Sequence, residues 1–469
     1  MASISLVQAS IAIVSLLLCF FYLFKKPHKG FLRNWPVLGM LPSLLMEFHR
    51  IYDFSVESLE KSNLMFVFKG PWYSGMDMVF TADDKNIRHM MNSSSSSNYT
   101  KGPDFKEVFD VLGDGILTAD SELWKSLRKV SKAMVDHQGF QKLSMSTTRK
   151  KLKDGLVPLF NSIAEEEKVV DLQDVFRRFT FDTTLITVTG CVDPRSLSIE
   201  MSEVGDFGKA LNDIGEGIMY RHVKPKFLWK LQRLVGFGQE KKLYKANATL
   251  NRTFKKFILD KREDIRSKEN FSGEGQDLLT SHMKLNATMY LKYHNDEKFL
   301  RDTMLAFILA GRDTTASALT WFFWHLSQNP HVVTNIRQEI NTNLPRITTG
   351  VGDPERSSYD SMEFLNKLVY LRGALYEAMR LHPPVPFERL SPVKPDVLPS
   401  GHRVDPSPRA CLGKEVAMTL MKTVVVEILQ NYNIEVVQGQ KIEPAPGPIL
   451  RMKHGLRVKL NKRCSPSAI

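Results

Sequence analysis

Residues 295–330 read NDEKFLRDTMLAFILAGRDTTASALTWFFWHLSQNP, and this stretch decides the fold of the chain. Asn295 and Asp296 are of types that start helices, and Pro330 is of the type that stops them. Between them we expect one helix of roughly thirty residues, whereas typical globular helices have about 8 to 20. The sequence therefore predicts that a single long helix crosses the whole domain.

The middle of this segment, residues 310–315 (AGRDTT), is unfavourable for a helix. Glycine costs about 1 kcal/mol in a helix interior, and Asp and Thr compete for backbone hydrogen bonds. One interpretation is a solvated kink. The other is that Gly311 lets a flat ligand approach while Asp313 and Thr314 hold a proton relay in an apolar cavity.

Trp124 and Arg128 form a second pair of interest, because residues four apart share one face of a helix. An indole and a guanidinium placed in this way can both donate hydrogen bonds to a buried carboxylate. The same spacing is also typical of a cation–π pair on a protein surface. The pair alone does not decide between these interpretations.

Glu377 and Arg380 are three apart, and residues 381–384 (LHPP) end their helix at once. Apolar neighbours such as Leu375 and Met379 predict that this ion pair is buried and hydrogen-bonded. An exposed pair would contribute almost nothing to stability.

Cys411 lies in residues 408–413 (PRACLG), directly before a predicted helix over residues 414–429. A helix N-terminus and the nearby Arg409 both favour a thiolate, which is a good metal ligand. The alternative is a small buried apolar side chain, and this is how we interpret Cys19, Cys191 and Cys464.

Residues 4–24 carry no formal charge and are long enough to cross a bilayer core of about 30 Å. Lys25, Lys26, Lys29 and Arg33 follow in place of a cleavage site, so we expect an uncleaved anchor with the rest of the chain in the cytosol. The predicted division is an anchor (1–24), a basic and proline-rich hinge (25–45) and one domain (46–469).

The composition is that of a globular protein, with 469 residues, 43% hydrophobic and 25% charged. The net charge of +13 favours anionic membranes or acidic protein partners. Basic residues are scattered without a recognisable groove-reading module, so we expect no nucleic-acid partner. The four cysteines show no disulfide or zinc spacing, which indicates a reducing compartment.

The remaining patterns predict a mainly α fold with small β-sheets. Residues 65–69 and 76–81 have the pattern of a hairpin, and residues 434–437 and 449–460 have strand character, with Gly455 as a turn. Helical spacing dominates residues 143–266, with breaks near 191–194 and 236–238.

Taken together and in this order, the four motifs resemble the signature of a cytochrome P450 monooxygenase. The resemblance implies that Cys411 is the thiolate ligand of a haem b iron and that Trp124, Arg128 and Arg409 bind the haem propionates. It implies that Gly311 lies in the haem-facing helix and that Asp313 and Thr314 deliver protons to dioxygen. Glu377 and Arg380 would be the family's buried charged pair.

Residues 388–391 (ERLS) and 449–453 (ILRMK) are similar to the plant branch of this family that hydroxylates fatty acids and wax alkanes. The resemblance implies a long-chain aliphatic substrate, as in cuticular wax biosynthesis, and a single-pass protein of the endoplasmic reticulum membrane. Electrons would come from an NADPH-dependent flavin reductase. Its acidic surface would meet five cations: Lys125, Lys129, Lys132, Lys414 and Lys422.

The chain departs from the family's pattern before Cys411, because only 34 positions separate it from Glu377. A block of several dozen residues is missing near 407/408, and with it the arginine that completes the Glu377–Arg380 network. The family's loop reads F-x-x-G-x-R-x-C-x-G, whereas this chain has Val404 in place of the Phe and Ser407 in place of the first Gly. A gene-model error and a genuine truncated product both explain the gap.

Two other functions remain open. A truncated, catalytically impaired membrane-anchored remnant would bind haem poorly, and the short interval before Cys411 favours it. An isomerase that rearranges a peroxide would need neither dioxygen nor a reductase. The intact pair of Asp313 and Thr314 argues against the isomerase, because dioxygen chemistry is what requires a proton relay.

Overall fold

The computed structural model describes residues 10, 14–15, 32–91, 99–191, 194–199, 205–267, 276–284, 296–343, 362–392, 396–401, 403–404 and 411–463. They belong to two compact units, Met1–Asp84 and Lys85–Ile469. The predicted anchor lies almost entirely outside the described residues, so the anchor and the domain division stay predictions. Within the described part of the chain, no helix is both long and apolar enough to cross a membrane.

The first unit contains short helices and a hairpin. Its helices are α2 (Leu41–Met46), η1 (Phe48–Arg50) and α3 (Ile51–Lys61). Strands β1 (Met65–Phe68) and β2 (Met78–Thr81) pair antiparallel with Phe66 opposite Phe80, whose rings stack 5.1 Å apart. The hairpin that the sequence predicts here is confirmed.

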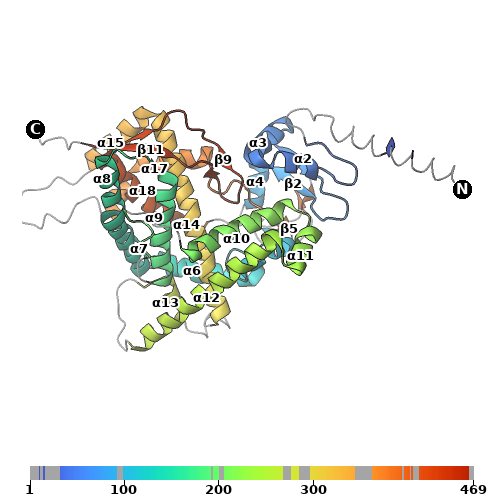
Figure 1. The fold of residues 1–469 in the computed structure, drawn as a ribbon, viewed down its shortest axis with the longest axis horizontal. Coiled ribbons are helices and arrows are strands. Elements are labelled where there is room, and N and C mark those ends of the chain that lie inside the picture. Colours follow the sequence, from blue (N-terminus) through green and yellow to red (C-terminus); the bar gives the residue numbers. More distant parts are fainter. Residues whose placement is uncertain are drawn as a thin grey trace, which may run out of the picture. The chain divides into compact units, whose positions relative to one another are not determined.

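The second unit is mainly helical, as predicted (Figure 1). Its helices before the central one are α4 (Asp84–Met91), α5 (Gly102–Val108), η2 (Asp110–Leu112), α6 (Ser121–Asp136), α7 (Gln138–Lys151), η3 (Leu152–Leu156), α8 (Val157–Glu165), α9 (Leu172–Thr189), α10 (Asp206–Val223), α11 (Lys226–Val235), α12 (Gly238–Ser267) and α13 (Leu278–Met283). The central helix α14 (Glu297–Gln328) is followed by α15 (Pro330–Asn343), α16 (Met362–Lys367), α17 (Val369–Leu381) and α18 (Lys414–Asn431).

Helix α14 has 32 residues, and Asp296 is its N-cap, so the predicted long helix is confirmed. It packs most extensively against α9 and also contacts α12, α13, α15, α17 and α18 (Figure 1). Trp321, Phe322 and Phe323 are almost completely buried. Because so many elements bury side chains on α14, the position of its residues is fixed by the whole second unit.

The strands of the second unit form small antiparallel sheets. One has three strands in the order β4 (Val170–Asp171), β11 (Arg457–Lys462) and β8 (Tyr432–Val436). The two-stranded sheets are β9 (Pro444–Ala445) with β10 (Arg451–Met452), β3 (Tyr99–Thr100) with β5 (Ser391–Pro392), and β6 (Asp396–Val397) with β7 (Arg403–Val404). The strand character predicted for residues 449–460 is confirmed on both sides of Gly455, whose φ is +69°. β10 and β11 pair with different partners, because β11 lies between β4 and β8.

Gly455 has a role that packing explains. Its φ is +69°, and a Cβ there would lie 2.1 Å from Oδ2 of Asp171. That carboxylate caps α9 by accepting from the Gln173 backbone N–H at 2.9 Å, and it also accepts from the Leu456 N–H at 2.8 Å. The glycine therefore lets the C-terminal sheet approach the cap of α9.

We predict that Gly455→Ala lowers the unfolding free energy by about 1–2 kcal/mol more than Gly439→Ala, because only the first substitution displaces a helix cap. Gly439 is the matched control: its φ is +75°, but a Cβ there meets nothing within 4 Å. Denaturant unfolding of both variants measures the difference. Equal losses would show that the contact with Asp171 is unimportant.

Candidate functional site

Helix α14 carries an open face in the middle of the buried core. Between Asp302 and Phe323 every residue is buried except Phe307, Leu309, Ala310, Gly311 and Thr314. Four of these recur at i, i+3, i+4 and i+7 and so share one face of the helix. The helix continues unbroken through residues 310–315. We call the face formed by Phe307, Ala310 and Thr314 the open face of α14.

Gly311 lies where α14 comes closest to α9. A Cβ at this position would lie 2.9 Å from both Oγ1 and Cγ2 of Thr184 on α9. The glycine therefore lets two helices approach closely, and its expected role in admitting a flat ligand stays a prediction. Ala310, one residue earlier, is the small exposed residue on the open face.

Thr314 lies on the open face, and its hydroxyl donates to the backbone oxygen of Ala310 at 2.6 Å. This bond satisfies the hydroxyl proton inside the helix while leaving the oxygen lone pairs as acceptors. Thr314 is half-buried. It can accept a proton or a hydrogen bond from a molecule on the open face.

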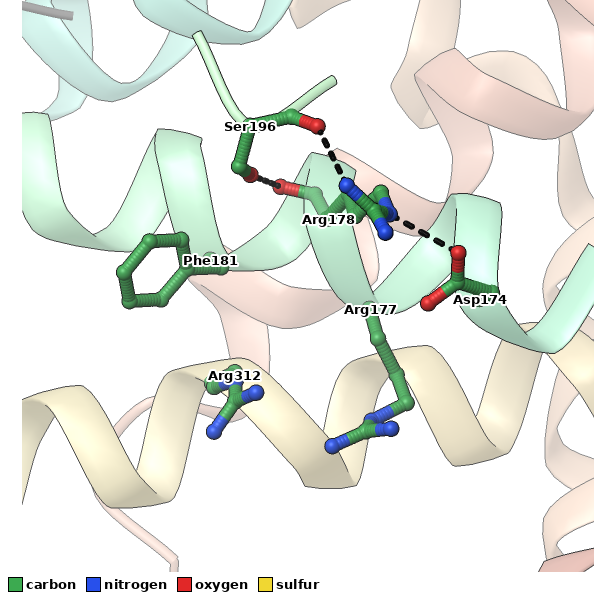
Figure 2. A pocket seen from close by; sticks show the side chains of 6 residues that line it. All are labelled: Asp174, Arg177, Arg178, Phe181, Ser196 and Arg312. Atoms are coloured by element: carbon green, nitrogen blue, oxygen red, sulfur yellow. Dashed lines mark hydrogen bonds and ion pairs between the residues drawn. The ribbon is translucent and has the colours of Figure 1, made fainter. Parts of the chain in front are cut away.

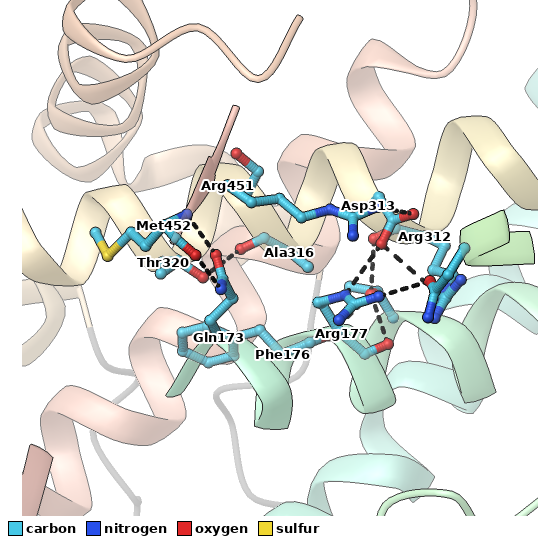
Figure 3. Close-up of polar contacts among 12 residues, drawn as sticks. Gln173, Phe176, Arg177, Arg312, Asp313, Ala316, Thr320, Arg451 and Met452 are labelled. Atoms are coloured by element: carbon cyan, nitrogen blue, oxygen red, sulfur yellow. Dashed lines mark hydrogen bonds and ion pairs between the residues drawn. The ribbon is translucent and has the colours of Figure 1, made fainter. Parts of the chain in front are cut away.

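Asp313 lies beside the open face among arginines, not in the apolar cavity expected from the sequence (Figure 3). Arg177 Nε of α9 donates to its Oδ1 at 3.3 Å, and Arg451 Nη2 of β10 donates to its Oδ2 at 2.9 Å. Arg312 Nε is 3.9 Å from Oδ1. A buried carboxylate requires such partners, which explains why the surroundings are cationic.

Arg451 is positioned by its neighbour in β10. The Gln173 side chain of α9 donates to Met452 O at 2.8 Å and accepts from Met452 N at 2.7 Å (Figure 3). These two hydrogen bonds hold β10 against the first turn of α9. It therefore holds the Arg451 side chain where its guanidinium reaches Asp313.

The charge state of Asp313 follows from two opposed effects. Burial raises the pKa of its carboxyl, but the positive charges of Arg312, Arg451 and Arg177 outweigh burial and hold the pKa below its ordinary value of 3.8. Asp313 is consequently an ionised acceptor at neutral pH. It can take part in proton transfer by receiving a proton and passing it on.

Cys411 is an exposed free thiol three residues before α18 begins, as predicted. Leu412 and Val416, on either side of that helix start, pack against the same cluster of buried apolar residues as Phe307 and Leu309 of α14. The thiol segment and the open face therefore border one apolar core. Arg409 lies outside the described residues.

Trp124 and Arg128 lie one turn apart on α6, and both are half-buried. The predicted placement on one helix face is therefore confirmed. Their expected role as donors to carboxylates stays a prediction.

Glu377 and Arg380 differ from the expectation. They form the predicted hydrogen-bonded pair, with two N–H···O bonds of 2.8 and 2.7 Å, but their side chains are 57% and 67% exposed. Hydrogen bonds from Arg380 lower the pKa of Glu377. The prediction of a buried pair is wrong, because apolar neighbours on the same helix leave both side chains exposed and no other element in the described part of the chain covers them.

The expected docking cations divide into two groups. Lys125, Lys129, Lys132 and Lys414 are exposed. Lys422 is 3% exposed and donates to Leu365 O at 2.7 Å, and burial lowers its pKa. The expectation that Lys422 offers charge to a partner is therefore corrected.

Comparison with known proteins identifies the class of protein. The sequence pattern of the family "Cytochrome P450" matches residues 30–400 and 408–460, which is most of the chain. The chain belongs to the cytochrome P450 family. Members are haem-containing monooxygenases, and this chain is a monooxygenase by that membership.

Three individual members of this family are similar to the chain over most of its length. The chain is 45% identical to alkane hydroxylase MAH1 of Arabidopsis thaliana over 95% of this chain and 97% of the relative. It is 33% identical to a noroxomaritidine synthase of Narcissus aff. pseudonarcissus over 92% and 91% of the two chains. Cytochrome P450 86B1 of Arabidopsis thaliana is 35% identical over 80% of this chain and 67% of its own length.

The solved heme domain of cytochrome P450DA superposes with a TM-score of 0.71 at 15% identity, covering 92% of this chain and 97% of that one. At this identity the likeness concerns the fold. The arrangement of helices around α14 is thus that of the family.

The residues present fit a haem group. A single exposed thiol at a helix N-terminus is the donor that a haem-thiolate iron takes, and the open face of α14 offers small and apolar side chains bordering the same core. Half-buried Trp124 and Arg128 supply N–H donors of the kind that bind propionates.

Sequence reasoning missed the arginines that control Asp313. Arg177 and Arg451 are 136 and 138 positions away from it along the chain. The available signal was chemical: an Asp in a buried helix needs cationic partners. No spacing rule could have named which arginines those are, because they come from α9 and β10.

We predict that Asp313→Asn lowers the unfolding free energy at pH 7 by about 3–5 kcal/mol, because three arginines lose their buried counter-charge. Since the folded pKa of Asp313 is lowered, its stabilisation is present above its ordinary value of 3.8 and is lost as pH falls through the folded pKa. The difference from wild type should therefore shrink below about pH 4.

Asp114→Asn is the control, because Asp114 pairs with Lys298 on the surface and its side chain is 70% exposed. We expect it to cost less than about 1 kcal/mol. Denaturant unfolding across pH measures both variants. A loss for Asp313→Asn that is small, or that does not depend on pH in acid, would contradict the charge network.

Proposed function

We propose that this protein is a haem-thiolate monooxygenase that hydroxylates long aliphatic chains, either alkanes or fatty acids as in cuticular wax biosynthesis. The observation that carries the proposal is that Phe307 of the open face packs against the same cluster of buried apolar residues as Leu412 and Val416, which lie beside Cys411. A thiolate on one side and an apolar, hydroxyl-bearing helix face on the other are what such a reaction needs.

In this proposal Cys411 holds the iron of haem b, and Trp124, Arg128 and Arg409 bind its propionates. When bound, the haem supplies dioxygen activation, with electron density from the cysteinate favouring O–O cleavage. Thr314 relays protons on the open face, because its Oγ1 can receive one proton while the hydroxyl gives up its own to the molecule bound there. Asp313, kept ionised by its arginines, takes up a proton from solvent and passes it toward Thr314.

An aliphatic substrate matches the side chains around Thr314. Phe307 and Ala310 offer apolar contact and exclude water, and they provide no charged group for a polar substrate. The 45% identity to a protein named alkane hydroxylase supports the same substrate class. Buried polar groups would be expected here if the substrate were rich in hydroxyl groups.

For electron supply we propose an NADPH-dependent flavin reductase. The exposed lysines at positions 125, 129, 132 and 414 offer a surface to an acidic partner. Such complementary charge speeds encounter and weakens with added salt.

The protein is proposed to lie on the endoplasmic reticulum membrane, with its domain in the cytosol. Besides residues 4–24, helix α11 supports a membrane location. An exposed apolar patch on this helix and just after its end consists of Phe227, Leu228, Leu231, Leu234, Val235 and Phe237. Exposed patches of this kind next to basic residues bind lipid surfaces.

In a chain lacking residues 1–24, Leu234→Glu should reduce vesicle binding about tenfold, and Val369→Glu, at an exposed site elsewhere, should not.

Two facts support a missing block before Cys411. The family match breaks between residues 400 and 408. The comparison with the Arabidopsis alkane hydroxylase runs over 500 positions against 469 residues in this chain, so at least 31 positions have no counterpart here. The exposed pair of Glu377 and Arg380 favours the alternative proposal, a truncated and impaired remnant with poor haem binding.

We predict that the chain, mixed with excess haem and reduced under carbon monoxide, gives a weak but detectable difference spectrum of thiolate-bound haem, and that Cys411→Ser abolishes it. With a flavin reductase and NADPH, the parent chain should convert long-chain alkanes or fatty acids to alcohols. Cys191→Ser is the control, because Cys191 is half-buried against the apolar core. Equal spectra from the parent and Cys411→Ser, or products unchanged by that substitution, would refute the assignment.

A further inference from the structure

The outer side of helix α12 carries a row of exposed cations. Their spacing of three, four and seven residues places them on one face of the helix. We call this row the basic face of α12, and its members are Lys241, Lys245, Arg252, Lys255 and Lys256. Arg252 is two residues from the buried Leu250 and Phe254, a rotation of about 200°. The basic face therefore points away from the core.

No carboxylate in the described part of the chain neutralises the basic face. Residues 241–259 include no Asp or Glu. Among the described residues, none of the five basic side chains has an ion-pair or hydrogen-bond partner. Lys242 lies on another side of the helix and pairs with Asp213 and Glu216 of α10, at 3.1 and 2.6 Å. The basic face thus presents five positive charges to solvent.

Basic residues in the interior of the second unit are paired instead. At the small pocket between α9 and α14, Arg178 donates to Asp174 at 2.8 Å and to Ser196 O at 3.0 Å (Figure 2). On α12, by contrast, Lys241 with Lys245 is a like-charged pair at i, i+4 spacing, and such pairs destabilise a helix slightly. The fold gains nothing from this row, whereas an anionic partner outside the molecule would stabilise it.

Exposed aromatic and apolar side chains accompany these cations. Tyr244, at the edge of the basic face, is 76% exposed, and Leu259, in line with Lys241 and Lys245, is 46% exposed. The apolar patch of α11 ends at Phe237, just before α12 begins, and the two helices pack against each other (Figure 1). Cations mixed with such side chains on one helix are typical of a surface that lies among lipid headgroups. An acidic protein would leave this apolar surface unexplained.

We propose that the basic face of α12 binds the headgroups of anionic phospholipids. The proposal rests on the membrane location proposed above and adds the class of lipid. Ammonium and guanidinium groups bind phosphate and carboxylate groups by charge-assisted hydrogen bonds. From Lys241 to Lys256 the face is about 22 Å long, which is enough for several headgroups side by side and too long for one small anion. Neither haem nor substrate takes part in this contact.

The reactivity of lysines in the full chain tests this contact. The chain is placed in lipid nanodiscs of phosphatidylcholine alone, or of phosphatidylcholine mixed with phosphatidylserine, and is acetylated and analysed by mass spectrometry. The four lysines of the basic face should react about fivefold more slowly in the anionic discs, and added salt should abolish the difference. Lys453 and Lys459 are the matched controls, because they are exposed near the end of the chain, and they should react equally in both discs.

A double substitution tests whether the cations act together. Each cation near an anionic surface strengthens the association about fivefold, so Lys245→Gln with Arg252→Gln should weaken it about 25-fold. The remaining lysines of the basic face should then lose most of their protection. Lys453→Gln with Arg457→Gln removes the same charge from exposed positions elsewhere and should leave the protection unchanged.

Three results would overturn the proposal: equal reactivity of the basic face in both discs, equal protection by both lipids, or protection that survives the double substitution. Protection that appears only after a flavin reductase is added would also overturn it, and would mark the basic face as a protein-docking surface. These results leave the proposed reaction untouched, because lysine reactivity depends on neither haem nor turnover. Co-purification of the chain with neutral discs reports on the anchor separately.

Discussion

The packing of α14 against α9 is the contact on which the rest of the structure depends. The two helices approach so closely at Gly311 and Thr184 that no side chain fits between them. This approach brings Arg177 of α9 to Asp313, and Phe307 of the open face packs against the same apolar cluster as Leu412 and Val416 beside Cys411. Neighbouring elements bury the remaining faces of α14 and leave its open face exposed. A reaction centre can therefore form at the open face.

Helix α9 also connects this centre to the end of the chain. Its cap, Asp171, receives the backbone beside Gly455, and its Gln173 binds the backbone of Met452. These contacts place Arg451 of the C-terminal strand β10 where its guanidinium hydrogen-bonds to Asp313. The charge state of an acid in the middle of the chain is thus set by residues near its end, so changes in the C-terminal sheet should affect proton transfer.

The sequence predicts the parts of this molecule that depend on local rules. The long helix, the hairpin before residue 84 and the helix after Cys411 follow from periodicity, caps and glycine positions, and all three are confirmed. Burial and long-range pairing could not be predicted in the same way. Glu377 has apolar neighbours on its own helix and yet is exposed, and Lys422 is buried although it is charged. Both outcomes depend on which distant elements cover a residue.

We propose that Cys411 and α14 form a haem site and that a missing block near 407/408 weakens it. The most direct test is haem binding, measured by the carbon monoxide difference spectrum, in two chains: this one, and one that carries the corresponding block of a full-length relative between Ser407 and Pro408. We expect a weak thiolate spectrum from the first and a full spectrum from the second, because the inserted residues would cover Glu377 and Arg380 and hold the thiol segment in place. A full spectrum from the unmodified chain, or no gain on insertion, would contradict this account.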